Sequence, residues 1–364
     1  MNIIDAHHHV WDLTIRDQPW LRQPGLEVLQ RSFGVADLRP AAERAGVTGT
    51  VLVQTVTLTD ETPEMLALAA AEPLIAAVVG WSDLTVTSVG DDLARLRSRR
   101  GGEYLASLRH QVQSEADPEW LRRPDVLRGL RAVAAAGLCY DLIVRPHQLP
   151  AACFAAAAVP ELTFVLDHAA KPEIADGTLE PWATSIRRLA ALPNTACKLS
   201  GLVTEGPSGS ALAAFVPFAD VILSAFGADR VMFGSDWPVC LLASDYAGVL
   251  ALAQALVSGL SEAERAAVFA GTAARVYRIA APAGEDQEAG GGAWRLPTRP
   301  ARAARASPPA PSPSEPVRCR SPRPPRPRAA GRPSSNCAAA RSGEDRGSTA
   351  DPGRPDPTRD DARR

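Results

Sequence analysis

Eight short runs of β-branched and apolar residues recur through the first 237 positions of this chain, and this repetition narrows its possible folds more than any other feature. Each run has the length of a buried strand, and intervening segments such as 123–137 and 181–194 have the apolar spacing of amphipathic helices. The runs occupy residues 3–10, 48–55, 75–82, 104–111, 138–144, 162–168, 195–201 and 229–237. Eight strand–helix units within about 280 residues predict an α/β fold, a distorted (β/α)8 TIM barrel in a single domain.

A doubly wound open sheet also alternates strands with helices, and it is the alternative architecture. No GxGxxG sequence follows the first run, and reactive residue types gather at the C-terminal ends of several runs, where barrel enzymes place their sites. These two observations favour the barrel. A last helix is predicted over residues 261–279, where Ser261 and Glu264 form a capping box and the barrel domain comes to its end.

The composition changes sharply after residue 281. Residues 282–364 hold 16 of the 32 prolines and 16 arginines, and such a segment buries too little apolar surface to offset its ordering entropy. We therefore predict a barrel over 1–281 and a disordered Pro/Arg/Ala-rich tail over 282–364. The barrel part carries 23 basic and 31 acidic side chains, a formal charge of −8, which argues against a specific nucleic-acid partner.

The apolar segments of the chain are short. No run approaches the roughly 18 residues that span a bilayer, and the chain does not open with a basic segment and an apolar core. The four cysteines of the barrel part lack metal-binding spacing, which indicates reduced, buried thiols. We expect a cytoplasmic protein that acts on a small molecule and has no membrane partner.

All six histidines lie at or just beyond the end of a predicted strand, and three of them are consecutive. Successive side chains of a strand point to opposite faces, so Asp5, His7 and His9 are expected on one face. His8 is then a structural residue that faces the helical layer. We therefore predict that His7 and His9 form an HxH pair at the barrel mouth.

Three charged residues near strand ends are further candidates. Lys171 and Lys198 are the two lysines of a chain that uses arginine at its other 37 basic positions, and an ammonium group is a useful point charge beside a developing oxyanion. Chance within a biased composition is the alternative explanation. Asp236 follows the last run and can bind a metal or act as a general base, although an aspartate ahead of Pro238 also suits a turn.

Other residues near the strand ends are candidates for binding a substrate. Arg109 and Arg145 are placed to clamp a substrate carboxylate, or else to form surface salt bridges. Trp11 and Trp237 are placed to stack on a sugar or ring face, or else to serve as hydrophobic lids. We also predict that Lys198 contacts the substrate, together with these arginines and tryptophans.

Taken together, these motifs have a specific pattern. DAHHHVW, RHQVQSEADPEWL, LDHAAKP, CKLSGL and RVMFGSDWPVC resemble the amidohydrolase superfamily. The resemblance is to its amidohydrolase-related branch, which includes L-fucono- and L-rhamnonolactonase-like proteins and 2-pyrone-4,6-dicarboxylate lactonase. It covers residues 3 to 280 and implies hydrolysis of a sugar-acid or related carboxylated lactone.

The resemblance also implies roles for individual residues. His7, His9 and Asp236 correspond to ligands of one divalent metal ion, for which we expect zinc, and His168 is a possible further ligand. Some members of the lactonase branch work without a metal. The catalytic set is Asp236, His168 and Lys171, with Asp236 as the general base that activates a water.

One motif departs from the family pattern, since LDHAAKP has Ala170 where the resemblance implies glycine. If that glycine lets the backbone approach the substrate, the added methyl group narrows the pocket. Two alternatives to the lactonase stay open at this point. One is a metal-dependent decarboxylase of the same superfamily, and the other is a non-catalytic barrel that binds a sugar acid.

Overall fold

The computed structural model describes residues 2–207, 209 and 211–280, and the predicted tail over 282–364 lies outside these residues. Its eight strands form one parallel sheet, in which each strand pairs with the next along the chain. They are β1 (Ile3–His8), β2 (Val47–Val53), β3 (Ile75–Gly80), β4 (Leu105–His110), β5 (Cys139–Leu142), β6 (Phe164–Leu166), β7 (Thr195–Leu199) and β8 (Val231–Phe233). Each predicted run matches one of these strands, although β2 begins one residue before its run, and the match confirms the predicted barrel.

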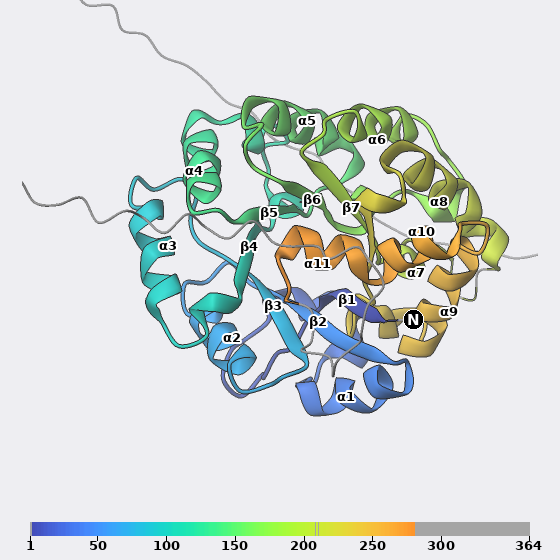
Figure 1. Cartoon of the computed structure of the whole chain (residues 1–364), viewed down its shortest axis with the longest axis horizontal. Helices are drawn as coiled ribbons and strands as arrows, with labels where there is room; N and C mark the ends of the chain where they lie inside the picture. Colours follow the sequence, from blue (N-terminus) through green and yellow to red (C-terminus); the bar gives the residue numbers. More distant parts are fainter. Residues whose placement is uncertain (1, 208, 210, 281–364) are drawn as a thin grey trace, which may run out of the picture. The chain divides into compact units, whose positions relative to one another are not determined.

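Helices alternate with the strands and lie around the ring of strands (Figure 1). They are α1 (Val35–Arg44), α2 (Glu61–Ala69), α3 (Val89–Ser98), α4 (Pro124–Ala135), α5 (Leu149–Ala158), α6 (Trp182–Ala190), α7 (Leu202–Glu205), α8 (Leu212–Phe226), α9 (Tyr246–Leu256), α10 (Glu262–Ala266) and α11 (Thr272–Tyr277). The later predicted runs are longer than their strands because their polar ends, such as Ser235 and Asp236, form loops at the barrel mouth.

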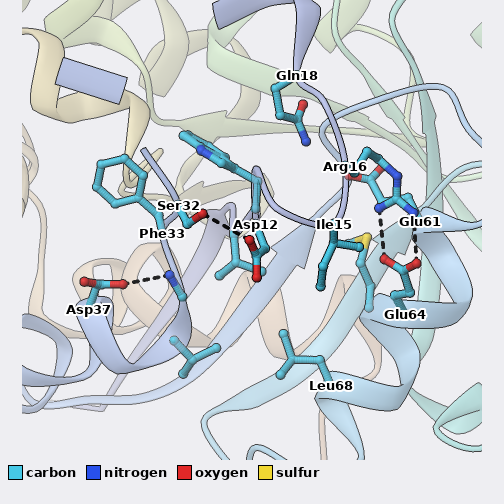
Figure 2. A pocket seen from close by; sticks show the side chains of 15 residues that line it. Asp12, Ile15, Arg16, Gln18, Ser32, Phe33, Asp37, Glu61, Glu64 and Leu68 are labelled. Atoms are coloured by element: carbon cyan, nitrogen blue, oxygen red, sulfur yellow. Dashed lines mark hydrogen bonds and ion pairs between the residues drawn. The ribbon is translucent and has the colours of Figure 1, made fainter. Parts of the chain in front are cut away.

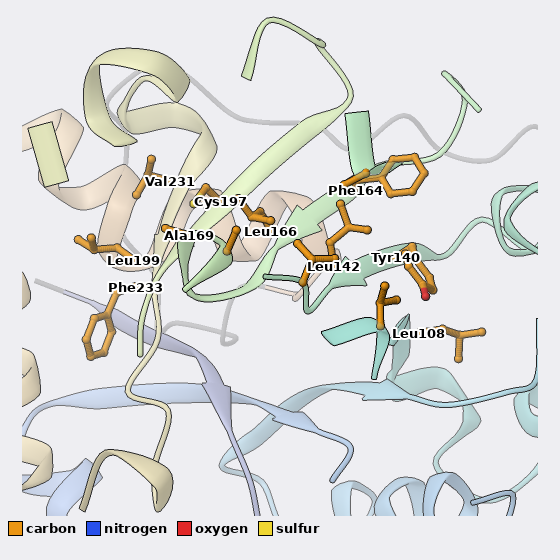
Figure 3. Packing of buried hydrophobic residues seen from close by; sticks show 14 of the residues in the cluster. Leu108, Tyr140, Leu142, Phe164, Leu166, Ala169, Cys197, Leu199, Val231 and Phe233 are labelled. Carbon is orange, nitrogen blue, oxygen red and sulfur yellow. The ribbon is translucent and has the colours of Figure 1, made fainter. Parts of the chain in front are cut away.

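Alternation along the strands produces two hydrophobic clusters. The outer cluster joins the sheet to the helices, and Figure 3 shows its members on β4 to β8, among them Leu108, Leu142 and Phe233. The inner cluster fills the barrel with smaller side chains, such as Val51 and Val165. A parallel sheet that is buried on both faces requires such near-continuous apolar strands.

The predicted last helix is present over residues 262–277, and it contains one irregular turn. A π-helical turn, Ala267–Gly271, separates α10 from α11, while the predicted capping box between Ser261 and Glu264 is present. Helix α11 lies across the middle of the ring of strands (Figure 1). Since the thiol of Cys139, the first residue of β5, donates to the Val276 carbonyl, α11 covers the N-terminal end of the barrel.

Within the described residues, no helix is long and apolar enough to cross a membrane. The cysteines of this part, Cys139, Cys153, Cys197 and Cys240, are all free thiols, as the sequence predicts. Three are buried and Cys153 is half-buried. Burial raises the pKa of the Cys197 thiol, which therefore stays protonated.

Candidate active site

The register of β1 changes just before the histidines. Three steps along β1, from Asp5 to His8, correspond to two steps along β2, and a bulge of this kind changes which face a side chain meets. His7 consequently lies inside the barrel, while the Asp5 carboxylate reaches Tyr246 of α9 in the helical layer. The prediction that Asp5 shares a face with His7 and His9 is wrong because simple alternation does not hold through the bulge.

The middle histidine of the run is isolated from polar groups. His8 is paired in register with Leu52, a member of the outer hydrophobic cluster, as expected for a side chain that faces the helices. Neither ring nitrogen of His8 has a hydrogen-bond partner among the described residues. Burial lowers the pKa of His8 to about 3, so its ring is neutral at pH 7.

Four residues from the end of β1 and from the segments after β1, β6 and β8 form what we call the histidine cluster: His7, His9, His168 and Asp236. The Nε2 atoms of His7, His9 and His168 lie 3.6, 3.5 and 3.8 Å from Oδ1 of Asp236. The two Nε2 atoms of the HxH pair are 3.1 Å apart. The structure thus brings together the four residues that the sequence analysis names as metal-ligand candidates.

The far nitrogen of two imidazoles is held by a hydrogen bond. Nδ1 of His9 lies 2.7 Å from the Val53 carbonyl oxygen, which can only accept, so Nδ1 carries the proton and Nε2 keeps its lone pair. Nδ1 of His168 lies 2.9 Å from the Ser200 hydroxyl. Partners of this kind orient histidines that bind metals, and they aim both Nε2 atoms at Asp236.

The backbone beneath the cluster is left-handed at several non-glycine residues. Asp236 has a φ of 57°, and four consecutive residues after β6 share this conformation: His168 (50°), Ala169 (48°), Ala170 (62°) and Lys171 (54°). Such conformations are costly for L-residues and concentrate at functional sites. The Ala170 side chain is fully buried in the outer hydrophobic cluster, and its left-handed backbone carries a conformational cost that glycine would not.

Burial sets the charges of the cluster. It lowers the pKa of His168 to about 4 and the pKa of His7 well below its usual value, so both rings are neutral at pH 7. Burial alone would raise the pKa of Asp236, but the neighbouring imidazoles, His168 above all, hold it below its usual range. An ionised carboxylate beside neutral imidazoles is the protonation state that metal binding requires.

These donor atoms fit one divalent ion. Tetrahedral zinc with bonds of about 2.0–2.1 Å separates its ligand atoms by about 3.3–3.4 Å, and the separations above range from 3.1 to 3.8 Å. One ligand atom each from His7, His168 and Asp236 lie within 4.8 Å of one another. The Nε2 atom of His9 is a fourth candidate ligand.

Below the cluster lie two cations and two carboxylates, which we call the ion-pair layer: Arg109, Lys198, Asp141 and Asp167. The Lys198 ammonium lies 2.6 Å from Asp141 and 2.9 Å from Asp167, and it is also 3.2 Å from Nδ1 of His7. All three charged side chains are fully buried. Lys198 therefore lies beneath the HxH pair, and this placement does not suit the direct substrate contact that the sequence suggests.

The other predicted cations are distributed differently. Arg109 points inward and is nearly buried, with Nη1 2.9 Å from Asp167 and 3.3 Å from Nε2 of His7. Arg145 is exposed beyond β5. The Lys171 ammonium lies 3.3 Å from the Glu205 carboxylate of α7. The structure gathers only Arg109 and Lys198 around the cluster.

Comparison with known proteins identifies the family. Residues 4–279 match the sequence profile of the Amidohydrolase family. The chain belongs to the amidohydrolase family. An L-fucono-1,5-lactonase of Burkholderia ambifaria is 40% identical over 286 residues, which cover 78% of this chain and 97% of the relative. An L-fucono-1,5-lactonase of Burkholderia multivorans is 41% identical over 292 residues, which cover 77% and 97%.

A solved structure supports the same relationship. An amidohydrolase from Burkholderia multivorans, crystallised with bound zinc, is 39% identical to this amidohydrolase and superposes with a TM-score of 0.73. The match covers 77% of this chain and 100% of that chain. The similarity therefore extends over the whole barrel.

The two predicted tryptophans are buried beneath the surface of this amidohydrolase. Trp11 and Trp237 both pack edge-on against Phe33, and their exposed fractions are 5% and 4%. The Trp11 indole donates to the Arg31 carbonyl. This packing is that of hydrophobic lids rather than of open stacking surfaces.

A cavity of about 420 Å³ is lined by the loop after β1, the start of α1 and helix α2. Figure 2 shows that its polar side chains pair with one another, Arg16 with Glu64 and Asp12 with Ser32. Its walls include Trp11 and other apolar residues but none of the four residues of the histidine cluster. The cavity is separate from the reactive groups.

Two members of the ion-pair layer were not among the predicted residues. Asp141 interrupts the apolar run LCYDLIV, and Asp167 directly precedes His168 in LDH. A charged residue within a buried strand needs a partner, so Asp141 carried a usable signal. Nothing in the sequence pairs Asp141 with Lys198, since the two are distant in the chain and meet only inside the barrel.

Proposed function

We propose that this amidohydrolase opens a sugar lactone by hydrolysis. The observation that carries the proposal is the convergence of three imidazole Nε2 atoms on the Asp236 carboxylate at the C-terminal end of the strands. Barrel enzymes place their sites at this end. The relatives named L-fucono-1,5-lactonase, at about 40% identity over the whole barrel, support a lactone as the substrate class.

A neutral lactone suits the charges around the site better than a carboxylated one. The Arg109 guanidinium is paired with Asp167, and Lys171 is paired with Glu205. A substrate carboxylate would have to displace one of these carboxylates in order to be clamped. We therefore narrow the predicted class, a sugar-acid or related carboxylated lactone, to an uncharged sugar lactone.

In the proposed reaction, Asp236 is the general base. Its carboxylate accepts a proton from a water whose oxygen attacks the lactone carbonyl carbon and forms a tetrahedral intermediate. The ring C–O bond then breaks, and Asp236 returns the proton to the departing alkoxide to give the open acid. His168, held by Ser200, is close enough to Asp236 to keep the attacking water beside it.

The histidine cluster fits a divalent metal, and we propose zinc as the ion. The ion would be held by His7, His168 and Asp236, with His9 as a fourth donor, and zinc there would supply polarisation of the carbonyl and a lowered water pKa. The zinc-bound Burkholderia structure supports the choice of ion. The pairing of Nδ1 of His9 with the Val53 carbonyl supports its role as a ligand.

Two lysines receive different proposed roles. Lys198 is a positioning residue, because its ammonium holds His7 from below and touches two buried carboxylates. Lys171 is our candidate for stabilising the tetrahedral oxygen, a role that requires its ammonium to turn away from Glu205.

A cytoplasmic location stays a prediction from the sequence.

The test uses the purified full-length chain. Acid release from L-fucono-1,5-lactone is followed with a pH indicator, beside 2-pyrone-4,6-dicarboxylate as a carboxylated lactone and an aromatic acid assayed for carbon dioxide. We expect hydrolysis of the sugar lactone alone. Preference for the dicarboxylate would overturn the neutral class, and carbon dioxide release without lactone hydrolysis would replace the lactonase with a decarboxylase. Metal analysis before and after chelation tests zinc.

A further inference from the structure

The barrel closes at a seam between β8 and β1. Within the described residues, no extended ladder joins the two strands; one bridge links His8 of β1 to Trp237, which lies in the segment after β8. Two backbone bonds lie beside it: the Asp236 N–H donates to the His7 carbonyl at 2.8 Å, and the His9 N–H donates to the Trp237 carbonyl at 2.7 Å. Residues of the histidine cluster therefore lie on both sides of a sparsely bonded seam.

The buried side chain of Asp5 spans this seam. Asp5 is fully buried, and its Oδ1 accepts from the Ser235 N–H at 2.8 Å and from the His7 N–H at 3.1 Å. Ser235 directly precedes Asp236. A single carboxylate oxygen thus joins the backbone that carries His7 to the backbone that carries Asp236.

The second oxygen of this carboxylate is also held. The hydroxyl of Tyr246, a buried residue of α9, donates to Oδ2 of Asp5 at 3.0 Å. The chain beside the seam is packed so closely that a Cβ atom at Gly234 would lie only 2.7 Å from Cβ of His7. Such a close approach leaves little tolerance for movement of either segment.

We propose that Asp5 is a positioning residue that sets the distance between His7 and Asp236, and that Tyr246 orients the Asp5 carboxylate. Asp5 lies on the side of β1 away from the cluster, so it acts through the backbone and does not touch the substrate. A displacement of about 1 Å in a reacting group can cost about 10²-fold in rate. The kinetic part of this inference rests on the proposed lactonase function.

The test compares full-length variants of these residues. Asp5→Ala leaves the Ser235 N–H without its acceptor, and we expect kcat to fall about 10²-fold with KM changed by less than about threefold. Asp5→Asn keeps one oxygen for both N–H groups and offers an amide N–H to the Tyr246 oxygen, so it should retain kcat within about tenfold. Tyr246→Phe should lose a severalfold factor in kcat.

Thr195→Val is the matched control for a lost buried hydroxyl. The Thr195 hydroxyl bonds the Leu189 and Leu192 carbonyls at the far end of the barrel, so its removal should lower the melting temperature but leave kcat unchanged. Rates are expressed per folded molecule. An Asp5→Ala variant with the wild-type kcat would overturn the inference.

Hydrogen exchange supplies a readout that does not depend on turnover. We expect the amides of residues 234–237 to exchange faster in Asp5→Ala and in Tyr246→Phe than in wild type, with no change in Thr195→Val. Unchanged exchange in Asp5→Ala would also overturn the inference. If the wild type opens no lactone, the proposed function fails, and the exchange result still decides whether Asp5 holds the seam.

Discussion

The histidine cluster and the ion-pair layer are both buried, yet their distances differ. In the ion-pair layer, each cation lies 2.6 to 2.9 Å from a carboxylate, within normal hydrogen-bond range. In the histidine cluster, the imidazole Nε2 atoms lie 3.5 to 3.8 Å from Oδ1 of Asp236, beyond normal hydrogen-bond range. The cations and carboxylates of the ion-pair layer neutralise one another, while the nitrogens of the histidine cluster converge on a point beside Asp236 and stay available to a ligand.

Asp236→Asn is the most direct test of the histidine cluster. The amide keeps the size of the side chain but cannot take a proton, so we expect kcat for lactone hydrolysis to fall about 10³-fold with little change in stability. Asp125→Asn, which alters a partly exposed carboxylate paired with Arg123, is the control and should keep kcat. Near-normal activity of Asp236→Asn would remove the proposed general base.

Lys198→Met tests the ion-pair layer. The substitution leaves Asp141 and Asp167 without their shared cation, and we expect a loss of about 3 kcal/mol or more in the free energy of unfolding. Arg39→Met breaks the partly exposed pair with Glu72 and should cost less than about 1 kcal/mol. Urea unfolding measures both, and equal losses would show that burial does not distinguish the two pairs.

His8→Leu separates the third histidine from the cluster. Removing two unpartnered ring nitrogens should raise the free energy of unfolding by about 1–2 kcal/mol at pH 7.5 and leave kcat intact. The exposed His147→Leu is the control, with a change below about 0.5 kcal/mol. A loss of activity in His8→Leu would place His8 in the site.

The same variant also tests a predicted pH dependence of the free energy of unfolding. The pKa of His8 is about 3 when folded against 6.5 when unfolded, so its contribution to stability is complete above pH 6.5 and is lost as the pH falls toward 3. From pH 6.5 to 5.0 the loss from this ring is about 2 kcal/mol. Denaturation curves of His8→Leu should therefore depend less on pH in this range, and an unchanged slope would contradict the prediction.

Ala170→Gly is expected to have the smallest effect. Glycine accepts a φ of 62° without steric cost, so the variant should gain up to about 1 kcal/mol in the free energy of unfolding despite the lost methyl. Ala190→Gly, at a buried helical position of α6, should lose about 1 kcal/mol. Losses of equal size in both variants would show that the left-handed turn stores no strain.

Local patterns in the sequence suffice to predict the barrel and the gathering of His7, His9, His168 and Asp236, because strand ends converge at the barrel mouth. The bulge in β1 is not predictable in this way, since no residue type between Asp5 and His8 marks it. The ion-pair layer depends on side chains from β4, β5, β7 and the segment after β6 meeting inside the barrel. Such contacts are set by the closed sheet and are invisible to periodicity.

Helix α11 has a consequence for the order in which the barrel is completed. The Tyr246 hydroxyl donates to Asp5 at the seam. Asp141 accepts a hydrogen bond of 2.8 Å from the Tyr277 hydroxyl, and Tyr277 belongs to α11, the last described helix. During synthesis, Tyr277 must therefore leave the ribosome before the Asp141 carboxylate on β5 can accept all of its hydrogen bonds. The eighth strand alone does not finish this barrel: the support beneath His7 is completed by the final turn of α11, well over a hundred residues after Asp141 is made.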